Sequence, residues 1–589
     1  MKALLTGNEA IARGAYEAGC QVATGYPGTP SSEIIKTMAQ LYDDEMYIEW
    51  STNEKVAMDA AAGAAYSGKR SMVTTKQVGM NVMMDSTLYS VYTGAEAGCV
   101  IVTSDDPGLF SSQNEQDNRW YSRLAKIPTF EPCDSQEAKD MMIEAFKFSE
   151  LFDTSCLLRS CMRVSHCKSV VELGERQENP KKLDKFPRNL PKYNCTAMYA
   201  KKMHIRIEEN LKKMAEYAET MPMNFIEWND RSIGIITSGV CYSYVKEVFP
   251  NASVLKLGMT FPLPPKKIKE FADGVDKVIV LEELDPVLEE QIRTMGIDCV
   301  GKELFPAFFE LLPDRLTDIA LEAGLVDKDP REKTEEVAGL PDRSPVLCAG
   351  CPHRSTYYLL AKKDIACAGD IGCYNLGAQP PFEAQHTMGA MGASIGQLHG
   401  MSIADLPEER RVCTIGDSTF FHSGLPALAN MVHNESKGCV IIMDNYTTAM
   451  TGHQDNPATD YKVLRTNKAR KIEIEPVVKA LGVEKIYVAD AFDLADVEKG
   501  LDECTAFDGP SVLITRGACV QLNKTADTPF KVDTDKCVAC HQCLKAGCPA
   551  IMLDDVTGKN GNKKVRIDHT LCNGCGICSQ VCPVKAINR

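Results

Sequence analysis

Two runs of cysteines near the C-terminus have the spacing of iron–sulfur ligands, and each run ends in Cys-Pro. In the bacterial two-cluster pattern, the first three cysteines of a run bind one cluster and the fourth binds the other. We therefore expect one [4Fe–4S] cluster on the set Cys537, Cys540, Cys543 and Cys582. We expect a second on the set Cys572, Cys575, Cys578 and Cys548. Such clusters transfer one electron at a time.

The first run departs slightly from the usual spacing. Four residues, 544–547, precede Cys548 where three are usual. Gly547 lies in this loop, and a loop that contains glycine absorbs one extra residue easily. A pair of zinc sites is the alternative interpretation. Zinc ribbons, however, use pairs of Cys-x2-Cys rather than triplets followed by a distant Cys-Pro.

A group of polar residues follows two predicted strands. Gly416, Asp417 and Ser418 come after the apolar run 411–415, and Asn445 and Thr447 come after the apolar run 439–443. Open α/β sheets bind ligands at the carboxyl ends of their strands. Mg²⁺ prefers oxygen ligands shared with phosphate groups, and Asp417, Asn445 and the Thr447 carbonyl supply three of them. A helix N-cap followed by a turn is the alternative.

These residues resemble the thiamine-diphosphate motif, in which Gly-Asp-Gly is followed further along the chain by Asn, although Ser418 stands where the motif has its last glycine. The resemblance implies thiamine diphosphate and Mg²⁺ as cofactors. It also implies a catalytic glutamate from another domain, which activates the aminopyrimidine ring. Glu54, at the start of a small-residue helix expected over 54–67, matches that position. The alternative is a first-turn glutamate favoured by the helix dipole.

The elements that must position these residues alternate between strands and helices. Apolar runs lie at 21–23, 71–74, 99–103 and 156–160, then at 232–236, 253–257 and 277–281, and finally at 411–415, 439–443 and 511–515. Strands that alternate with helical patterns predict parallel sheets. We expect an α/β protein with three parallel-sheet domains and a small C-terminal α+β domain of ferredoxin-like type for the two clusters.

Changes in composition place the domain boundaries. The expected domains are 1–171, 230–326, 346–520 and 528–589. The segment 172–229, with one amphipathic stretch near 201–219, and the charged segment 327–345 are expected to be linkers.

Composition also limits the partners and the compartment. A net charge of −15 disfavours nucleic acid as a partner. No apolar run approaches the roughly 18 residues that span a bilayer, and the first residues lack the apolar stretch of a signal peptide. We therefore expect a cytoplasmic protein without membrane contact, whose cysteines are reduced thiols or metal ligands.

Further motifs resemble the 2-oxoacid:ferredoxin oxidoreductases. The segment 26–32, Tyr-Pro-Gly-Thr-Pro-Ser-Ser, is similar to their Tyr-Pro-x-Thr-Pro-Ser-Ser segment, which implies that Thr29 contacts the oxoacid carboxylate. The segment 348–353 resembles the Cys-x-Gly-Cys-Gly-His of the family, with Pro352 in place of a glycine. It implies that Cys351 and His353 contact the cofactor. The segment 370–373 resembles a stretch that lines the thiamine pocket, and it adds Asp370 and Cys373.

The order of these motifs is similar to that of the large (alpha) subunits of the indolepyruvate branch of the family. This order is a pyrimidine-binding domain, a transketolase-C-like domain, a diphosphate-binding domain and a two-cluster domain. The resemblance implies oxidative decarboxylation of an aryl 2-oxoacid, indolepyruvate or a phenylpyruvate-type acid. The products would be an acyl-CoA and electrons, with CoA as co-substrate and external ferredoxin as acceptor. It also implies a smaller beta (gamma-like) subunit and a dimer of heterodimers.

Several alternatives stay open at the level of the sequence. The same reaction on pyruvate, a branched-chain oxoacid or 2-oxoglutarate is one. A non-oxidative thiamine-dependent decarboxylase is another, and an electron-transfer subunit with a degenerate site is a third. Gly28, beside Thr29, favours an aryl substrate if the missing side chain leaves room for a ring. The alternative is that Gly28 occupies a turn that needs a positive φ.

Overall fold

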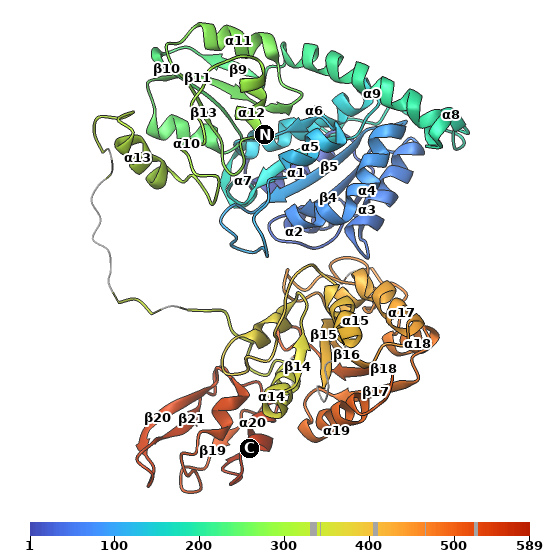
Figure 1. The fold of residues 1–589 in the computed structure, drawn as a ribbon, viewed down its shortest axis with the longest axis vertical. Helices are drawn as coiled ribbons and strands as arrows, with labels where there is room; N and C mark the ends of the chain where they lie inside the picture. The colour runs from blue at the N-terminus through green and yellow to red at the C-terminus, as the bar shows by residue number, and fades with distance from the viewer. Residues whose placement is uncertain (330, 332–338, 342, 405–409, 466, 524–527) are drawn as a thin grey trace. The chain divides into compact units, whose positions relative to one another are not determined.

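The computed structural model describes residues 1–329, 331, 339–341, 343–404, 410–465, 467–523 and 528–589. The chain divides into two compact units, residues 1–335 and 336–589, coloured blue to green and yellow to red in Figure 1. Residues 330, 332–338 and 342 of the expected linker 327–345 lie outside the described residues.

A seven-stranded sheet forms the centre of the first unit, with strand order β12-β6-β7-β5-β4-β2-β3. The strands are β2 (Val22–Gly25), β3 (Tyr47–Trp50), β4 (Ser71–Lys76), β5 (Cys99–Asp105), β6 (Thr129–Phe130), β7 (Cys156–Cys161) and β12 (Met259–Phe261). All neighbours are parallel except β12 and β6. Every residue of β5 is buried, as expected for a parallel sheet covered on both faces.

Helices connect the parallel strands of this sheet. They include α2 (Ser32–Tyr42), α3 (Glu54–Tyr66), α4 (Gln77–Thr93) and α6 (Ser135–Phe152), and α1 (Gly7–Glu17) leads into β2. Asn53 caps α3, because its side chain accepts a hydrogen bond from the Val56 backbone N–H. The alanine-rich face of α3 packs against the sheet and α4. This packing fixes the direction of the residues at the start of α3.

A second sheet of the first unit has the order β13-β10-β11-β9. Its strands are β9 (Phe225–Glu227), β10 (Asp230–Ser238), β11 (Ala252–Leu257) and β13 (Val278–Leu281). The β10, β11 and β13 strands are parallel, and β9 is antiparallel to β11. The next strand after β11 is β12, which pairs with β6 of the seven-stranded sheet. The chain therefore passes directly from one sheet into the other.

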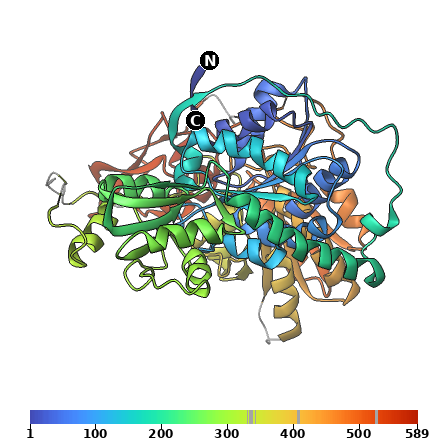
Figure 2. The same ribbon diagram turned by 90° about the horizontal axis from the view of Figure 1, so that it is seen from above.

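The segment 172–229, expected to be a linker, contains α8 (Leu190–Tyr193) and α9 (Ala197–Ala218). Figure 2 shows the extended chain that leads to α8 as a long teal loop. The buried residues of α9 are Met203, Ile207, Met214 and Ala218, which lie on one helical face. Ile207 belongs to the core that includes residues of α3 and α4, so α9 contributes to the packing of the first unit.

The second unit has a five-stranded, fully parallel sheet with the order β14-β15-β16-β18-β17. The strands are β14 (Ala366–Ala368), β15 (Arg411–Gly416), β16 (Gly438–Asp444), β17 (Lys485–Asp490) and β18 (Pro510–Arg516). Its helices include α14 (Arg354–Lys363), α15 (Ala393–Ala404), α17 (Leu425–His433) and α19 (Leu494–Thr505). Apolar cores lie on both faces of this sheet.

The C-terminal part of the second unit is small. It has two antiparallel pairs, β19 (Lys531–Val532) with β22 (Ile587–Asn588) and β20 (Ile551–Thr557) with β21 (Lys563–Ile567). The short helices η3 (Gln542–Ala546) and α20 (Ile577–Val581) carry some of the cysteines. Within the described residues, no helix is both long and apolar enough to cross a membrane. The expected fold class, parallel-sheet α/β with a small α+β end, is confirmed.

Candidate active site and cysteine groups

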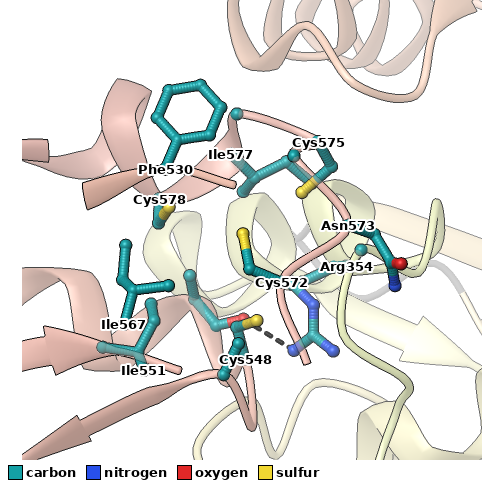
Figure 3. A pocket seen from close by; sticks show the side chains of 15 residues that line it. Arg354, Phe530, Cys548, Ile551, Ile567, Cys572, Asn573, Cys575, Ile577 and Cys578 are labelled. Carbon is teal, nitrogen blue, oxygen red and sulfur yellow. Dashed lines mark hydrogen bonds between the residues drawn. The ribbon is translucent and has the colours of Figure 1, made fainter. Parts of the chain in front are cut away.

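The eight C-terminal cysteines line two cavities, and each cavity takes three cysteines from one run and one from the other. The cavity in Figure 3 is lined by Cys548 from the first run together with Cys572, Cys575 and Cys578. The other is lined by Cys537, Cys540 and Cys543 together with Cys582 from the second run. The structure thus brings together the two crossed sets that the spacing predicts.

The thiols within each cavity influence one another. Burial, together with the neighbouring thiols of Cys582, Cys537 and Cys540, raises the pKa of Cys543 to about 11. Burial likewise raises the pKa of Cys578, with added effects from the other thiols of its cavity. Iron ligation favours the thiolate and would offset this cost.

The arrangement of the thiols bears on the size of the bound group. Among the described residues, no three His, Cys, Asp or Glu side chains converge as they would on a single metal ion. Four thiolates on one zinc ion, each about 2.3 Å from the metal, would lie close together. Each cavity is lined by four thiols, the number of ligands that a [4Fe–4S] cluster takes.

A third group of four thiols was missed by sequence reasoning. Cys348 and Cys519 raise the pKa of Cys373, and Cys373 and Cys348 raise that of Cys351. Cys348 also raises the pKa of Cys519. We expected Cys351 and Cys373 to line the thiamine pocket and assigned nothing to Cys348 and Cys519. The Cys-x2-Cys spacing of Cys348 and Cys351 could have indicated a metal site. Cys519 lies far along the chain, and nothing in the sequence connects it with that pair.

The residues of the predicted diphosphate site meet at the ends of adjacent strands. β15 and β16 are parallel neighbours, with Gly416 opposite Met443. The residues that follow these strands therefore lie side by side. The Thr447 backbone N–H donates to Asp417 Oδ2 at 3.1 Å and to Asn445 Oδ1 at 3.3 Å. Asp417, Ser418, Asn445 and Thr447 are all buried.

The charge at this site fits a bound cation. Burial and the nearby Asp444 carboxylate together raise the pKa of Asp417 to about 8. A buried carboxylate that lacks a compensating charge is costly, and Mg²⁺ would supply that charge. Position 416 requires glycine for a steric reason, because a Cβ there would lie 2.7 Å from the ring of Tyr374. The Ser418 backbone N–H donates to Asp417 Oδ1 at 2.7 Å.

His353 lies against the same site. Its Nε2 is 3.3 Å from Asn445 Nδ2, and burial lowers the pKa of His353 to about 4. The imidazole is therefore neutral at ordinary pH and accepts this hydrogen bond. The Asp370 carboxylate accepts hydrogen bonds from the backbone N–H groups of Ile371, Gly392 and Ser394. Asp370 thus anchors the start of α15, and direct contact with a cofactor stays a prediction.

The predicted catalytic residues of the first unit lie after the carboxyl ends of β2 and β3. Thr29 is half-buried in the loop after β2. Glu54 is buried at the start of α3, close to Gly79 on α4, where a Cβ would lie 2.5 Å from Glu54 Oε1. Thr29 and Glu54 belong to one unit and the diphosphate residues to the other.

Lys76, which sequence analysis did not single out, fills the space beside Gly28. A Cβ on Gly28 would lie 2.8 Å from Cγ of Lys76, so the missing side chain accommodates this lysine. Gly28 is not among the glycines with positive φ, and the alternative that it occupies a turn of that kind is wrong. Lys76 Nζ donates to the Ser111 carbonyl at 2.7 Å. Burial lowers the pKa of Lys76 to about 8, while the Asp106 and Glu54 carboxylates act in the opposite direction.

Four family models match consecutive parts of the sequence. They are the thiamine-diphosphate-binding domain of pyruvate flavodoxin/ferredoxin oxidoreductases (residues 13–224), an indolepyruvate oxidoreductase domain (251–303), the C-terminal binding domain of thiamine pyrophosphate enzymes (370–515) and a 4Fe-4S dicluster domain (536–586). Indolepyruvate oxidoreductase subunit IorA of Thermococcus kodakarensis is 41% identical, and the match covers 99% of this chain and 96% of that protein. The chain belongs to the IorA family.

Other relatives agree with this assignment. Subunit IorA of Archaeoglobus fulgidus is 39% identical over 100% of this chain and 97% of its own length. The 2-oxoglutarate synthase subunit KorA of the same organism is 25% identical over 54% of this chain and 97% of its own. The IorA-family chain is therefore an oxidoreductase subunit of the 2-oxoacid type. It has thiamine-diphosphate-binding domains and an iron–sulfur domain of the 4Fe-4S dicluster type.

Proposed function

We propose that this chain, with a smaller partner subunit, oxidises an aryl 2-oxoacid such as indolepyruvate to its acyl-CoA. In the balanced reaction, one oxoacid anion, one CoA thiol and two oxidised ferredoxins give one acyl-CoA, one CO₂, two reduced ferredoxins and one proton. The observation that carries the proposal is the crossed sorting of eight cysteines into two cavities, in the same unit as the Asp417–Asn445 site.

The proposed residues each have a task on this route. Thiamine diphosphate, when bound, would supply the nucleophilic carbon and the electron sink that decarboxylation of an oxoacid needs. Asp417, Asn445 and the Thr447 carbonyl would hold its Mg²⁺, and His353 would orient Asn445. Glu54 would hydrogen-bond the cofactor's aminopyrimidine ring.

The substrate carboxylate needs a positive charge, and Lys76 is placed to supply it. The Lys76 stem lies against Gly28, the residue before Thr29. Its ammonium group makes no ion pair within 4.0 Å to any described carboxylate; the short contact that it does make is to a carbonyl. A carboxylate that meets both Thr29 and Lys76 would gain a charge-assisted hydrogen bond. This arrangement suits a 2-oxoacid of any side chain, so the aryl preference rests on the family.

The deciding experiment is an anaerobic assay of the chain with its partner subunit. Ferredoxin or viologen reduction would be followed with indolepyruvate, phenylpyruvate, pyruvate and 2-oxoglutarate. CoA-dependent reduction that is fastest with the aryl acids is expected. Faster reduction with pyruvate or 2-oxoglutarate would contradict the substrate proposal. Free aldehyde without any reduced acceptor would favour a non-oxidative decarboxylase.

Replacing Glu54 tests the catalytic assignment. We expect Glu54→Gln to lower turnover by roughly 10²–10⁴-fold, the usual value of a positioned proton-transfer group, while thiamine diphosphate still binds in a calorimetric titration. Asp59→Asn, on an exposed turn of the same helix, is the matched control. If Glu54→Gln keeps the full wild-type turnover, Glu54 has no catalytic role and only interacts favourably with the dipole of α3.

Iron content tests the cysteine groups. Two clusters require about eight iron atoms per chain. Cys348, Cys351, Cys373 and Cys519 influence one another's pKa, and Gln521, two residues after Cys519, donates to Cys348 Sγ at 3.4 Å. We therefore include a further iron–sulfur site on these four thiols in the proposal. A count near twelve would support it, and a Cys519→Ser variant should then lose about four.

A further inference from the structure

A buried arginine lies beside the cavity in Figure 3. Arg354 is the first residue of α14 and is 1% exposed. Its guanidinium donates to the carbonyls of Ala546 at 2.8 Å, Leu347 at 2.9 Å and Cys348 at 2.6 Å. Its Nε has no hydrogen-bond partner. Among the described residues, no carboxylate lies within 4.0 Å of it.

The buried positive charge of Arg354 needs a nearby anion. Carbonyl groups solvate a guanidinium, but burying a cation without a countercharge costs several kcal/mol on general grounds. Figure 3 shows the Arg354 side chain beside Cys572 and Cys548. Arg354 and the four cysteines line the same cavity. A [4Fe–4S] cluster on four thiolates is anionic in both redox states and gains one more negative charge on reduction, so a cluster in this cavity would supply a countercharge.

The other cysteine cavity has no such cation. Its lining contains no Arg or Lys, and its one basic side chain is His541. The His541 ring contacts the Lys563 carbonyl at 2.7 Å. Two cavities with the same four ligands therefore differ by one buried positive charge. Because a nearby cation stabilises the more negative, reduced state, the two clusters should differ in reduction potential.

Arg354 also links the cavity of Figure 3 to the diphosphate site. The preceding residue, His353, contacts Asn445, and Arg354 itself lines the cavity. Two consecutive residues thus contact the proposed diphosphate site and the cysteine cavity. Both lie within the second unit.

We propose that Arg354 is a positioning residue for electron transfer. It raises the reduction potential of the cluster on Cys548, Cys572, Cys575 and Cys578 above that of the other C-terminal cluster. This cluster is then the first of the two to receive each electron from the thiamine side. Each transfer moves one electron and no proton: the cluster gains one negative charge, which Arg354 stabilises. The proposal rests on the proposed function.

The test is a redox titration of the complete enzyme, followed by electron paramagnetic resonance. Arg354→Gln keeps a hydrogen-bond donor but removes the charge, and Arg354→Lys keeps the charge. We expect Arg354→Gln to weaken reduction of one cluster about tenfold or more, which is about 59 mV for one electron. The other C-terminal cluster should not shift, and Arg354→Lys should retain most of the wild-type potential. Unshifted potentials in Arg354→Gln with full iron content would overturn the proposal, as would equal shifts in both variants.

A second measurement does not need the Arg354 variants to fold. Cys548→Ser and Cys540→Ser each replace a ligand of one cavity in a chain that keeps Arg354. We expect Cys548→Ser to alter the higher-potential signal and Cys540→Ser the lower. The reverse assignment would overturn the proposal. If the wild-type enzyme shows no reducible cluster at all, the proposed function fails instead.

Discussion

At the residue scale, the most informative contact is that of Lys76 with Gly28. A glycine beside the predicted carboxylate-binding threonine suggested room for an aromatic ring. The structure shows that the space holds the stem of a lysine. One sequence position was correctly singled out, but its neighbour across the sheet was not, because β2 and β4 meet only in the folded sheet.

The lysine predicts a pH-dependent affinity. We expect Lys76→Met to raise KM for the oxoacid by roughly 10- to 100-fold, the value of a hydrogen bond to a charged group, with a smaller effect on kcat. Because the pKa of Lys76 is lowered to about 8, wild-type KM should rise above that pH as the ammonium is lost. KM of the variant should be flat there.

Steady-state kinetics between pH 6 and 9 would check this prediction. Lys55→Met is a suitable control, since Lys55 forms an exposed ion pair with Asp59, and such pairs contribute little. An unchanged KM in Lys76→Met would mean that the lysine supports the loop through Ser111 only.

At the element scale, α9 shows where composition misleads. The segment 172–229 is rich in Lys, Glu, Pro and Asn, which favoured a linker. Its helix nevertheless buries a line of apolar residues. The amphipathic stretch near 201–219 was visible in the sequence. Its partner was not, because α4 lies far upstream and nothing local specifies that contact.

Two isoleucines on α9 make a matched pair. Ile207 is 5% exposed within the core, and Ile205, one position before Arg206, is 60% exposed. We expect Ile207→Ala to lower the free energy of unfolding of the first unit by about 2–5 kcal/mol, the cost of removing a buried aliphatic side chain. Ile205→Ala should change it by less than about 0.5 kcal/mol. Urea denaturation would measure both, and equal effects would show that α9 is only loosely attached.

At the scale of the whole molecule, a buried carboxyl group of the first unit makes the stability of the folded chain depend on pH. Burial raises the pKa of Glu283 to about 7, with a further contribution from Glu310. The folded chain therefore binds more protons than the unfolded chain between about pH 4.5 and 7. Stability is fully present at the low end of this window and is lost as pH rises through 7.

We expect Glu283→Gln to remove this pH dependence and to stabilise the first unit at pH 8 by up to about 3 kcal/mol. The Gln oxygen can still accept from the Leu311 backbone N–H, which bonds Glu283 at 2.9 Å. Thermal unfolding at pH 5 and pH 8 would measure the effect. Glu290→Gln, at an exposed ion pair, should show none. A variant less stable than wild type at pH 8 would contradict the assignment.

Much of the architecture was predictable from local pattern. Apolar runs at 71–74, 99–103 and 439–443 became β4, β5 and β16 with ends shifted by at most a few residues, because runs of buried apolar residues are a strong strand signal. The strand ends that carry Asp417 and Asn445 followed from the same pattern. Long-range convergence did not, as Cys519 beside Cys348 and Arg354 beside Cys575 illustrate, since no local rule sets those contacts.

The exchange of one cysteine between the two C-terminal runs has a consequence for biogenesis. Cys582 completes a set whose other members begin at Cys537, and β22 closes against β19 only when the last residues have been made. Iron loaded onto a growing or clipped polypeptide would therefore meet an incomplete coordination shell. Cluster insertion into this cavity is expected to wait until Cys582 has been made, and a cut between Cys578 and Cys582 would remove a ligand of this cluster while the four cysteines of the other cavity stay complete.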